Sequence, residues 1–184
     1  MTDNDAIGAV KHWVEQVVVG QNFCPFARPE VQKQRICYTL SSTCSTTSAI
    51  DSLLDECERL DSHADTSTTL LIFDVGFADF DDFLHLINEG EQALIRAGYE
   101  GTYQLAHFHP QYCFDGLEEQ DAANYTNRAP YPVLHILREA QLSEALANYN
   151  QPDNIPKRNI KKARQLQASF FEKCLADCHR QAKC

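Results

Sequence analysis

TTLLIFDVGF, residues Thr68–Phe77, is a nearly continuous apolar run. A run of this length is typical of a central strand whose two faces are both buried. Apolar residues recur at three- and four-residue spacing on either side of it, over 50–60 and over 83–95. This spacing predicts two amphipathic helices, the second of which is capped by Asp79 and ends at Gly98.

The rest of the first 109 residues continues this alternation of helices and strands. Apolar spacing predicts a first helix over Asp3–Val19, and alternating residues predict strands over Arg35–Leu40 and Thr102–His109. Strands separated by helices favour parallel pairing through right-handed crossovers. We therefore expect an α/β protein with a small three-stranded, mainly parallel sheet packed by helices. A mixed, ferredoxin-like α+β arrangement fits the same pattern. A length of 184 residues fits a single domain over 1–184.

The C-terminal third is expected to be helical and to wall one end of the sheet. Pro132 suits the first position of a short helix that runs through Glu139, and a second short helix follows from Ser143. Gln151–Pro156 is predicted to be a linker, and a long final helix begins near Pro156. Basic residues cluster at its start, and we interpret them as a solvated helix face rather than an RNA contact. They are Lys157, Arg158, Lys161, Lys162 and Arg164.

Composition narrows the class of protein. The formal net charge is -10, so phosphate backbones repel the chain and nucleic acid is an unlikely partner. No apolar run is long enough to span a bilayer, and the polar start of the chain does not resemble a signal peptide. We therefore expect a cytoplasmic protein with no membrane partner, in which the 8 cysteines are reduced. The sequence does not indicate an oligomeric state.

Polar residues that suit chemistry gather between His107 and Glu139. His107 and His109 are two apart on a predicted strand, so they share a face at its C-terminal end, where parallel sheets bind ligands. His135 and Glu139 are four apart on the expected helix, with Arg138 beside them. Arg128 and Arg138 have a structural alternative, which is local pairing with carboxylates such as Asp115, Asp121 or Glu139.

The first functional hypothesis is an enzyme that acts on a small anionic metabolite. Cys24 lies on the turn that follows the first helix and is the candidate nucleophile, with His109 or His135 as its base. Arg128 and Arg138 would hold the anion by bidentate hydrogen bonds. Glu139 would orient His135 or one of the arginines.

Two other hypotheses use overlapping residues. In one, a single divalent transition metal is bound by imidazole and carboxylate ligands. The candidate ligands are His107, His109, His135 and Glu139. In the other, the protein is a non-catalytic module in which Arg128, Arg138 and His135 bind an anion or the tail of a partner protein.

Three segments resemble an uncharacterised bacterial family, the domain of unknown function 1415. They are NFCPFA at 22–27, LAHFHPQYCF at 105–114 and NYTNRAPYPVLHILRE at 124–139. The resemblance covers nearly the whole chain and implies a shared constellation, but it brings no established activity. That constellation is Cys24, His109, Tyr112, Asn124, Asn127, Arg128, His135, Arg138 and Glu139. Tyr112, Asn124 and Asn127 would then join the two arginines in binding a ligand. The resemblance implies a small residue such as serine at position 107, so a metal site common to the family would have to work without His107.

Overall fold

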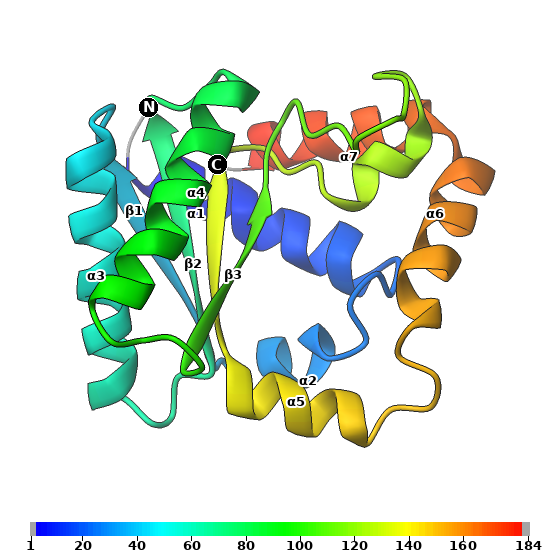
Figure 1. Cartoon of the computed structure of the whole chain (residues 1–184). Coiled ribbons are helices and arrows are strands. Elements are labelled where there is room, and N and C mark those ends of the chain that lie inside the picture. Colours follow the sequence, from blue (N-terminus) through cyan, green and yellow to red (C-terminus); the bar gives the residue numbers. More distant parts are fainter. Residues whose placement is uncertain (1–2, 182–184) are drawn as a thin grey trace.

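A mixed four-stranded sheet forms the centre of the molecule. The computed structural model describes residues 3–181. β1 (Ile36–Ser42) pairs in parallel with β2 (Thr68–Val75). β4 (Val133–Arg138) is antiparallel to β2 on one side and to β3 (Tyr103–Phe108) on the other. The strand order is therefore β1-β2-β4-β3 (Figure 1).

The α/β class is confirmed, but the expectation of three mainly parallel strands is wrong. β1, β2 and β3 do run in one direction, as the alternation with helices predicted. The error is the segment 132–139, which was expected to be a helix and instead forms β4. Val133, His135 and Leu137 alternate with Leu134, Ile136 and Arg138, which is the two-residue period of a strand. The pattern of a short apolar run does not distinguish a strand from a helix. Here the segment becomes a strand because it forms hydrogen bonds with both β2 and β3.

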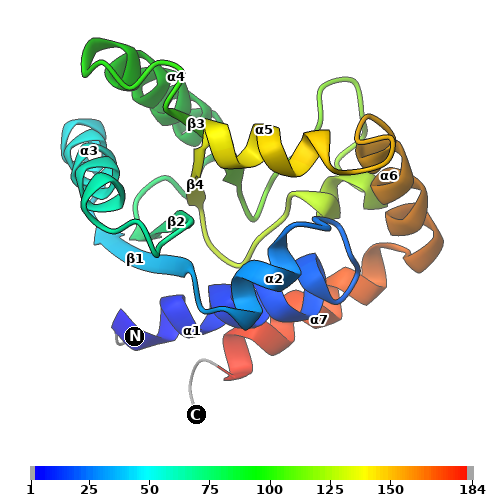
Figure 2. The ribbon, with the colours of Figure 1, turned by 90° about the horizontal axis from the view of Figure 1, so that it is seen from below.

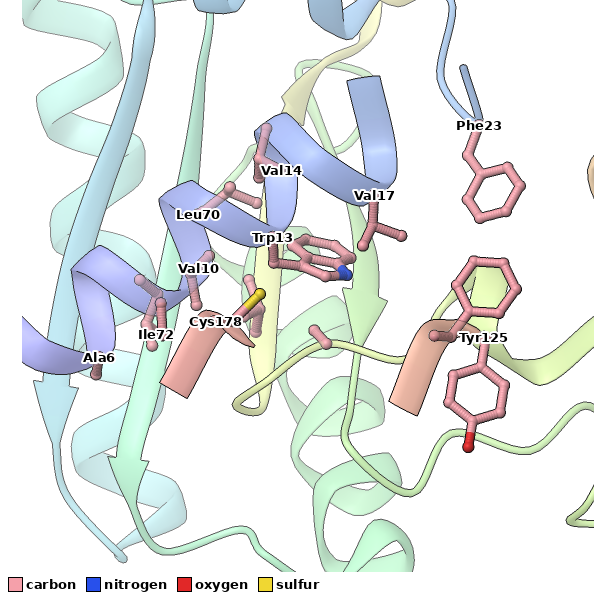
Figure 3. Close-up of a cluster of buried hydrophobic side chains, with 14 of the residues drawn as sticks. Ala6, Val10, Trp13, Val14, Val17, Phe23, Leu70, Ile72, Tyr125 and Cys178 are labelled. Atoms are coloured by element: carbon pink, nitrogen blue, oxygen red, sulfur yellow. The ribbon is translucent and has the colours of Figure 1, made fainter. Parts of the chain in front are cut away.

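Helices cover both faces of the sheet. α3 (Thr46–Ser62) and α4 (Phe80–Arg96) pack on one face, and α1 (Asp3–Trp13) packs on the other, with α7 (Ala168–Gln181) alongside α1 (Figures 1 and 2). Strand alternation divides the core accordingly. Leu70 and Ile72 join the α1 side (Figure 3). Val133 belongs to the same cluster. Leu71, Phe73 and Leu134 join the α3 side.

Several predicted helix ends are confirmed. The Asp79 carboxylate accepts hydrogen bonds from the backbone N–H groups of Asp81 and Asp82, at 2.9 and 3.2 Å, which caps α4. Gly98, with a φ of 81°, follows the last turn of that helix. The first helix extends to Val19 as expected, but its last part, η1 (Val14–Val19), is π-helical.

The remaining helices surround one end of the sheet and its polar loop. α2 (Ala27–Gln32) and α5 (Glu139–Ala147) lie at the end where β2 begins and β4 ends (Figures 1 and 2). The expected single final helix is two helices, α6 (Asn154–Leu166) and α7, because Gln167 adopts a φ of 68° between them. η2 (Ala122–Thr126) is a 3-10 turn. Within residues 3–181, no helix combines the length and the apolar composition that a membrane crossing requires.

Candidate functional site

A cavity of about 300 Å³ lies between the α1 face of the sheet, α2 and α5. Its walls come from every segment at this end of the fold, and most of the side chains are apolar. They are Trp13, Val14, Val18, Cys24, Phe26, Ala27, Glu30, Ile36, Ser67, Thr68, Leu70, Ala106, Phe108, His135, Leu137, Arg138, Gln141, Leu142 and Ala145. Ligand sites are commonly apolar clefts of this size that contain a few polar groups. The cavity is therefore the strongest candidate site in the described residues.

His135 is the polar group on the sheet side of this cavity. On β4 it lies in register between Leu70 of β2 and Ala106 of β3, so a small neighbour leaves space beside its ring. The imidazole touches the Phe108 ring, with 6.1 Å between ring centroids. Within residues 3–181, no hydrogen bond to its ring nitrogens is found. Trp13 also lines the cavity, and its indole Nε1 is fully buried without a hydrogen-bond partner in these residues. Burial lowers the pKa of His135 to about 4, so the ring is neutral at physiological pH.

Cys24 enters the same cavity from the turn between η1 and α2. Three consecutive carbonyl groups of this turn accept hydrogen bonds from side chains of α6. Lys162 donates to Gln21 O at 2.7 Å, Arg158 to Asn22 O at 2.8 Å, and Asn159 to Phe23 O at 2.6 Å. The basic cluster that was interpreted as a solvated helix face thus partly serves to fix the backbone that carries Cys24.

The Cys24 thiol is held in its neutral form. Burial raises the pKa of the thiol, and this effect exceeds three smaller ones that favour the thiolate. Those are hydrogen bonds from the backbone N–H groups of Phe26 and Ala27 and the charge of Arg158. A thiol with a raised pKa is a poor nucleophile at neutral pH.

Aromatic side chains make up much of the apolar wall. Trp13 of α1 and Phe108 of β3 meet edge to face, with ring centroids 4.9 Å apart. Phe26 meets Tyr149, which follows α5, at 5.4 Å. Val14 and Val18 lie on the π-helical turn, a rare conformation that is frequent at functional sites.

Sequence reasoning missed these apolar residues because it searched for polar ones. A usable signal was present: strand alternation places Ala106 and Phe108 on the face opposite His107 and His109. The same rule, applied to β4, would have placed them beside His135.

His109 lies on the other face of the sheet and is fully engaged there. It is 0% exposed, and its ring stacks on Phe83 at 5.2 Å. Nε2 donates to Phe77 O at 2.9 Å, because Nδ1 accepts from the backbone N–H of Gln111 at 3.0 Å. Burial is the main cause that lowers the pKa of His109. With both nitrogens bonded inside the fold, this side chain acts as a structural residue.

His107 shares that face, as its two-residue spacing from His109 predicted. Its half-buried ring contacts Phe83 at 6.4 Å and Tyr112 at 5.5 Å. Burial, and secondarily the proximity of His109, lowers the pKa of His107. The sheet therefore separates both histidines from His135.

The two arginines of the expected anion clamp bind backbone carbonyls. Arg138 borders the cavity, but its guanidinium group reaches to the α3 face. There it donates to Leu60 O at the end of α3, to Thr66 O at 3.2 Å and to the Tyr103 hydroxyl at 3.3 Å. Arg128 donates to Tyr112 O at 3.0 Å and to Glu119 O at 2.9 Å.

The asparagines of the NYTNR motif organise the loop that follows β3. Asn124 is buried; its Oδ1 accepts from Phe114 N–H at 3.0 Å and its Nδ2 donates to Glu118 O at 2.9 Å. The side-chain oxygen of Asn127 accepts a hydrogen bond from the Thr126 hydroxyl, and its backbone carbonyl accepts one from His109 N–H. Together with Arg128, these residues fold residues 110–121 onto η2, and they lie outside the cavity.

Glu139 begins α5, where its backbone N–H donates to Thr102 O at 3.0 Å. Since β4 ends at Arg138, the helical face that Glu139 was expected to share with His135 does not exist. Across residues 3–181, no three His, Cys, Asp or Glu side chains gather closely enough to hold a metal ion. The four expected metal ligands are divided between the two faces of the sheet and the start of α5.

The three segments quoted from the sequence do meet at the cavity, but mostly through other residues. Cys24 represents the first segment, Ala106 and Phe108 the second, and His135 the third. A family model described as "Protein of unknown function (DUF1415)" matches residues 5–173. The chain belongs to this family. DUF1415 membership thus rests on a match that includes every element lining the cavity. No curated protein and no solved structure matches the chain.

Proposed function

We propose that this DUF1415 protein binds a small, uncharged, largely apolar molecule in the cavity between the sheet, α2 and α5. One observation carries the proposal: the His135 imidazole, which makes no hydrogen bond within residues 3–181, lines an apolar cavity. The residue is only partly buried, and its nitrogens are not among the fully buried atoms without a partner, so they can be reached from the cavity. A ligand group can therefore bond His135 without displacing a partner within the protein.

The charge of the ligand follows from the groups around it. Cys24 and His135 are both neutral at physiological pH. Glu30 Oε1 is paired with Arg35 at 2.6 Å, while Glu30 Oε2 is buried without a hydrogen-bond partner in residues 3–181. The Arg138 guanidinium lies on the other face. An anionic ligand would therefore lose its hydration here without gaining a cationic partner. We therefore replace the anionic metabolite expected from the sequence with a neutral molecule.

A thermal-shift screen of neutral fragments tests this function. Ala145 lines the cavity from α5, whereas Ala147 on the same helix is exposed and does not. Fragments that bind should raise the melting temperature of the wild type and of Ala147→Trp, because a ligand stabilises the state that binds it. They should not raise that of Ala145→Trp, whose indole fills the cavity. Equal shifts in all three proteins, or no shift with any neutral fragment, would refute the proposal.

A second candidate is an enzyme in which Cys24 is the nucleophile. It is favoured by the presence of Cys24 and His135 in one cavity and by two backbone N–H groups beside the sulfur. In this case a fragment with an electrophilic carbon should modify Cys24 covalently in the wild type but not in Ala145→Trp. Intact-protein mass spectrometry measures the adduct.

A further inference from the structure

The volume of the cavity sets the size of what it holds. Its volume is about 300 Å³. An apolar cavity of about 150 Å³ in another protein is known to bind benzene. The space here is thus about twice that needed for one aromatic ring. A single ring would leave part of it empty, and two fused rings would fill it more completely.

The walls favour a flat molecule. Trp13, Phe26 and Phe108 reach the cavity from α1, from the residue before α2 and from β3, so aromatic rings border it on several sides. Trp13 and Phe108 hold one another edge to face at 4.9 Å. Aromatic side chains interact best with other rings in stacked or edge-to-face arrangements. An aliphatic chain of the same volume would forgo these contacts.

One polar group interrupts this apolar surface on the sheet side. A neutral imidazole carries one N–H donor and one nitrogen acceptor, and no hydrogen bond to either is found in residues 3–181. The neighbouring Thr68 hydroxyl already donates a hydrogen bond to Ile136 O. His135 is therefore the point on this wall that discriminates between ligands of equal size and shape.

We propose that the ligand is a neutral, planar molecule of about two fused rings, with one hydrogen-bonding group that faces His135. This proposal rests on the function proposed above and specifies the chemical class for the same site. His135 determines specificity through its hydrogen bond, while the aromatic walls supply most of the contact area.

Calorimetric titration with matched probes tests the class. Indole and benzothiophene share one ring frame, but benzothiophene has sulfur where indole has N–H. Indole should bind the wild type about tenfold more tightly, the ratio expected for one hydrogen bond to a buried group. Indole-2-carboxylate, which is anionic at neutral pH, should bind at least tenfold more weakly than indole.

Two further measurements separate the role of His135 from a general effect on folding. In His135→Phe the preference for indole over benzothiophene should disappear. In the wild type, which needs no substitution, indole should shift the imidazole ¹⁵N resonances of His135 and benzothiophene should not. Binding of all probes should be lost in Ala145→Trp and kept in Ala147→Trp.

The outcomes distinguish the two proposals. If aliphatic or anionic probes bind this cavity as tightly as indole, or if the His135 resonances do not respond to indole, the chemical class is wrong and the small-molecule site remains. If no probe of any class binds in a way that Ala145→Trp abolishes, both proposals fail.

Discussion

His135 links the stability of the protein to pH. Its pKa is about 4 in the folded state, against 6.5 for an unperturbed histidine. Because the folded pKa is the lower one, the unfolded chain takes up the proton first as the pH falls. The stability present above pH 6.5 should therefore decrease between pH 6.5 and 4, by about 3 kcal/mol from this group.

Urea unfolding of the wild type and of His135→Gln, at pH 7 and pH 4.5, measures this effect. Glutamine keeps a polar side chain but does not titrate. His107 and His109 also have lowered pKa values, but they contribute equally to both proteins and cancel in the comparison. The wild type should lose more stability than the variant on acidification. A difference between the two proteins that does not change with pH would show that the imidazole is not buried as described.

Cys24 should be a slow thiol. Its candidacy as a nucleophile depended on a nearby histidine that would lower the thiol pKa. Burial instead raises the pKa of the Cys24 thiol, whereas Cys44 is exposed. Iodoacetamide at pH 7.5, followed by peptide mass spectrometry, should label Cys44 before Cys24. Unfolding in urea should equalise the two rates, which controls for differences in peptide detection. Faster labelling of Cys24 in the folded protein would favour the enzyme candidate.

The site could be predicted from the sequence only in part, and the reason lies in single side chains. Cys24 and His135 were expected in one pocket, and the structure brings them together there. His109, Asn124 and Arg128 were equally suggestive as residue types, but their polar atoms bond loop backbone. A sequence records which residues can form hydrogen bonds. It does not record whether the fold has already used them.

Elements were predictable where a local signal and the burial pattern agreed. The apolar run of β2 and the capped, amphipathic α4 are of this kind. The prediction of a helix in place of β4 was wrong because the residues of this segment fit a four-residue and a two-residue spacing equally well. The choice is made by hydrogen bonding to β2 and β3, which are distant in sequence. The position of the cavity depends on that choice, since only a strand directs His135 and Arg138 to opposite faces.

Arg138 should act as a structural link between β4 and α3. Its guanidinium group donates to Leu60 O and Thr66 O, and these carbonyls would lose a charged donor in Arg138→Met. We expect this substitution to lower the free energy of unfolding by about 2–3 kcal/mol. Binding of neutral fragments should be unchanged in the folded variant. Arg96→Met, at an exposed position near the end of α4, should cost less than about 0.5 kcal/mol. If Arg138→Met loses fragment binding but keeps its stability, Arg138 binds the ligand and is not a structural link.

At the scale of the whole molecule, β2 and β4 couple the two halves of the core. Alternate residues of each strand belong to different clusters: Leu70 and Val133 to the α1 side, Leu71 and Leu134 to the α3 side. Neither layer of helices can leave the sheet without exposing a face of both strands. We therefore expect residues 3–181 to unfold as one cooperative unit.

Trp13, the single tryptophan, reports on the α1 layer, because it is 1% exposed within that cluster. A reporter for the other layer is Tyr99→Trp in a Trp13→Phe background, since Tyr99 packs against the α3 cluster. Urea transitions followed by each tryptophan should coincide with the far-UV circular dichroism transition of the same protein. If the Trp13 signal changes at lower urea concentration than circular dichroism, the α1 layer opens separately. The cavity would then be closed by a layer that can detach, and ligand binding should shift the Trp13 transition more than the Tyr99→Trp transition.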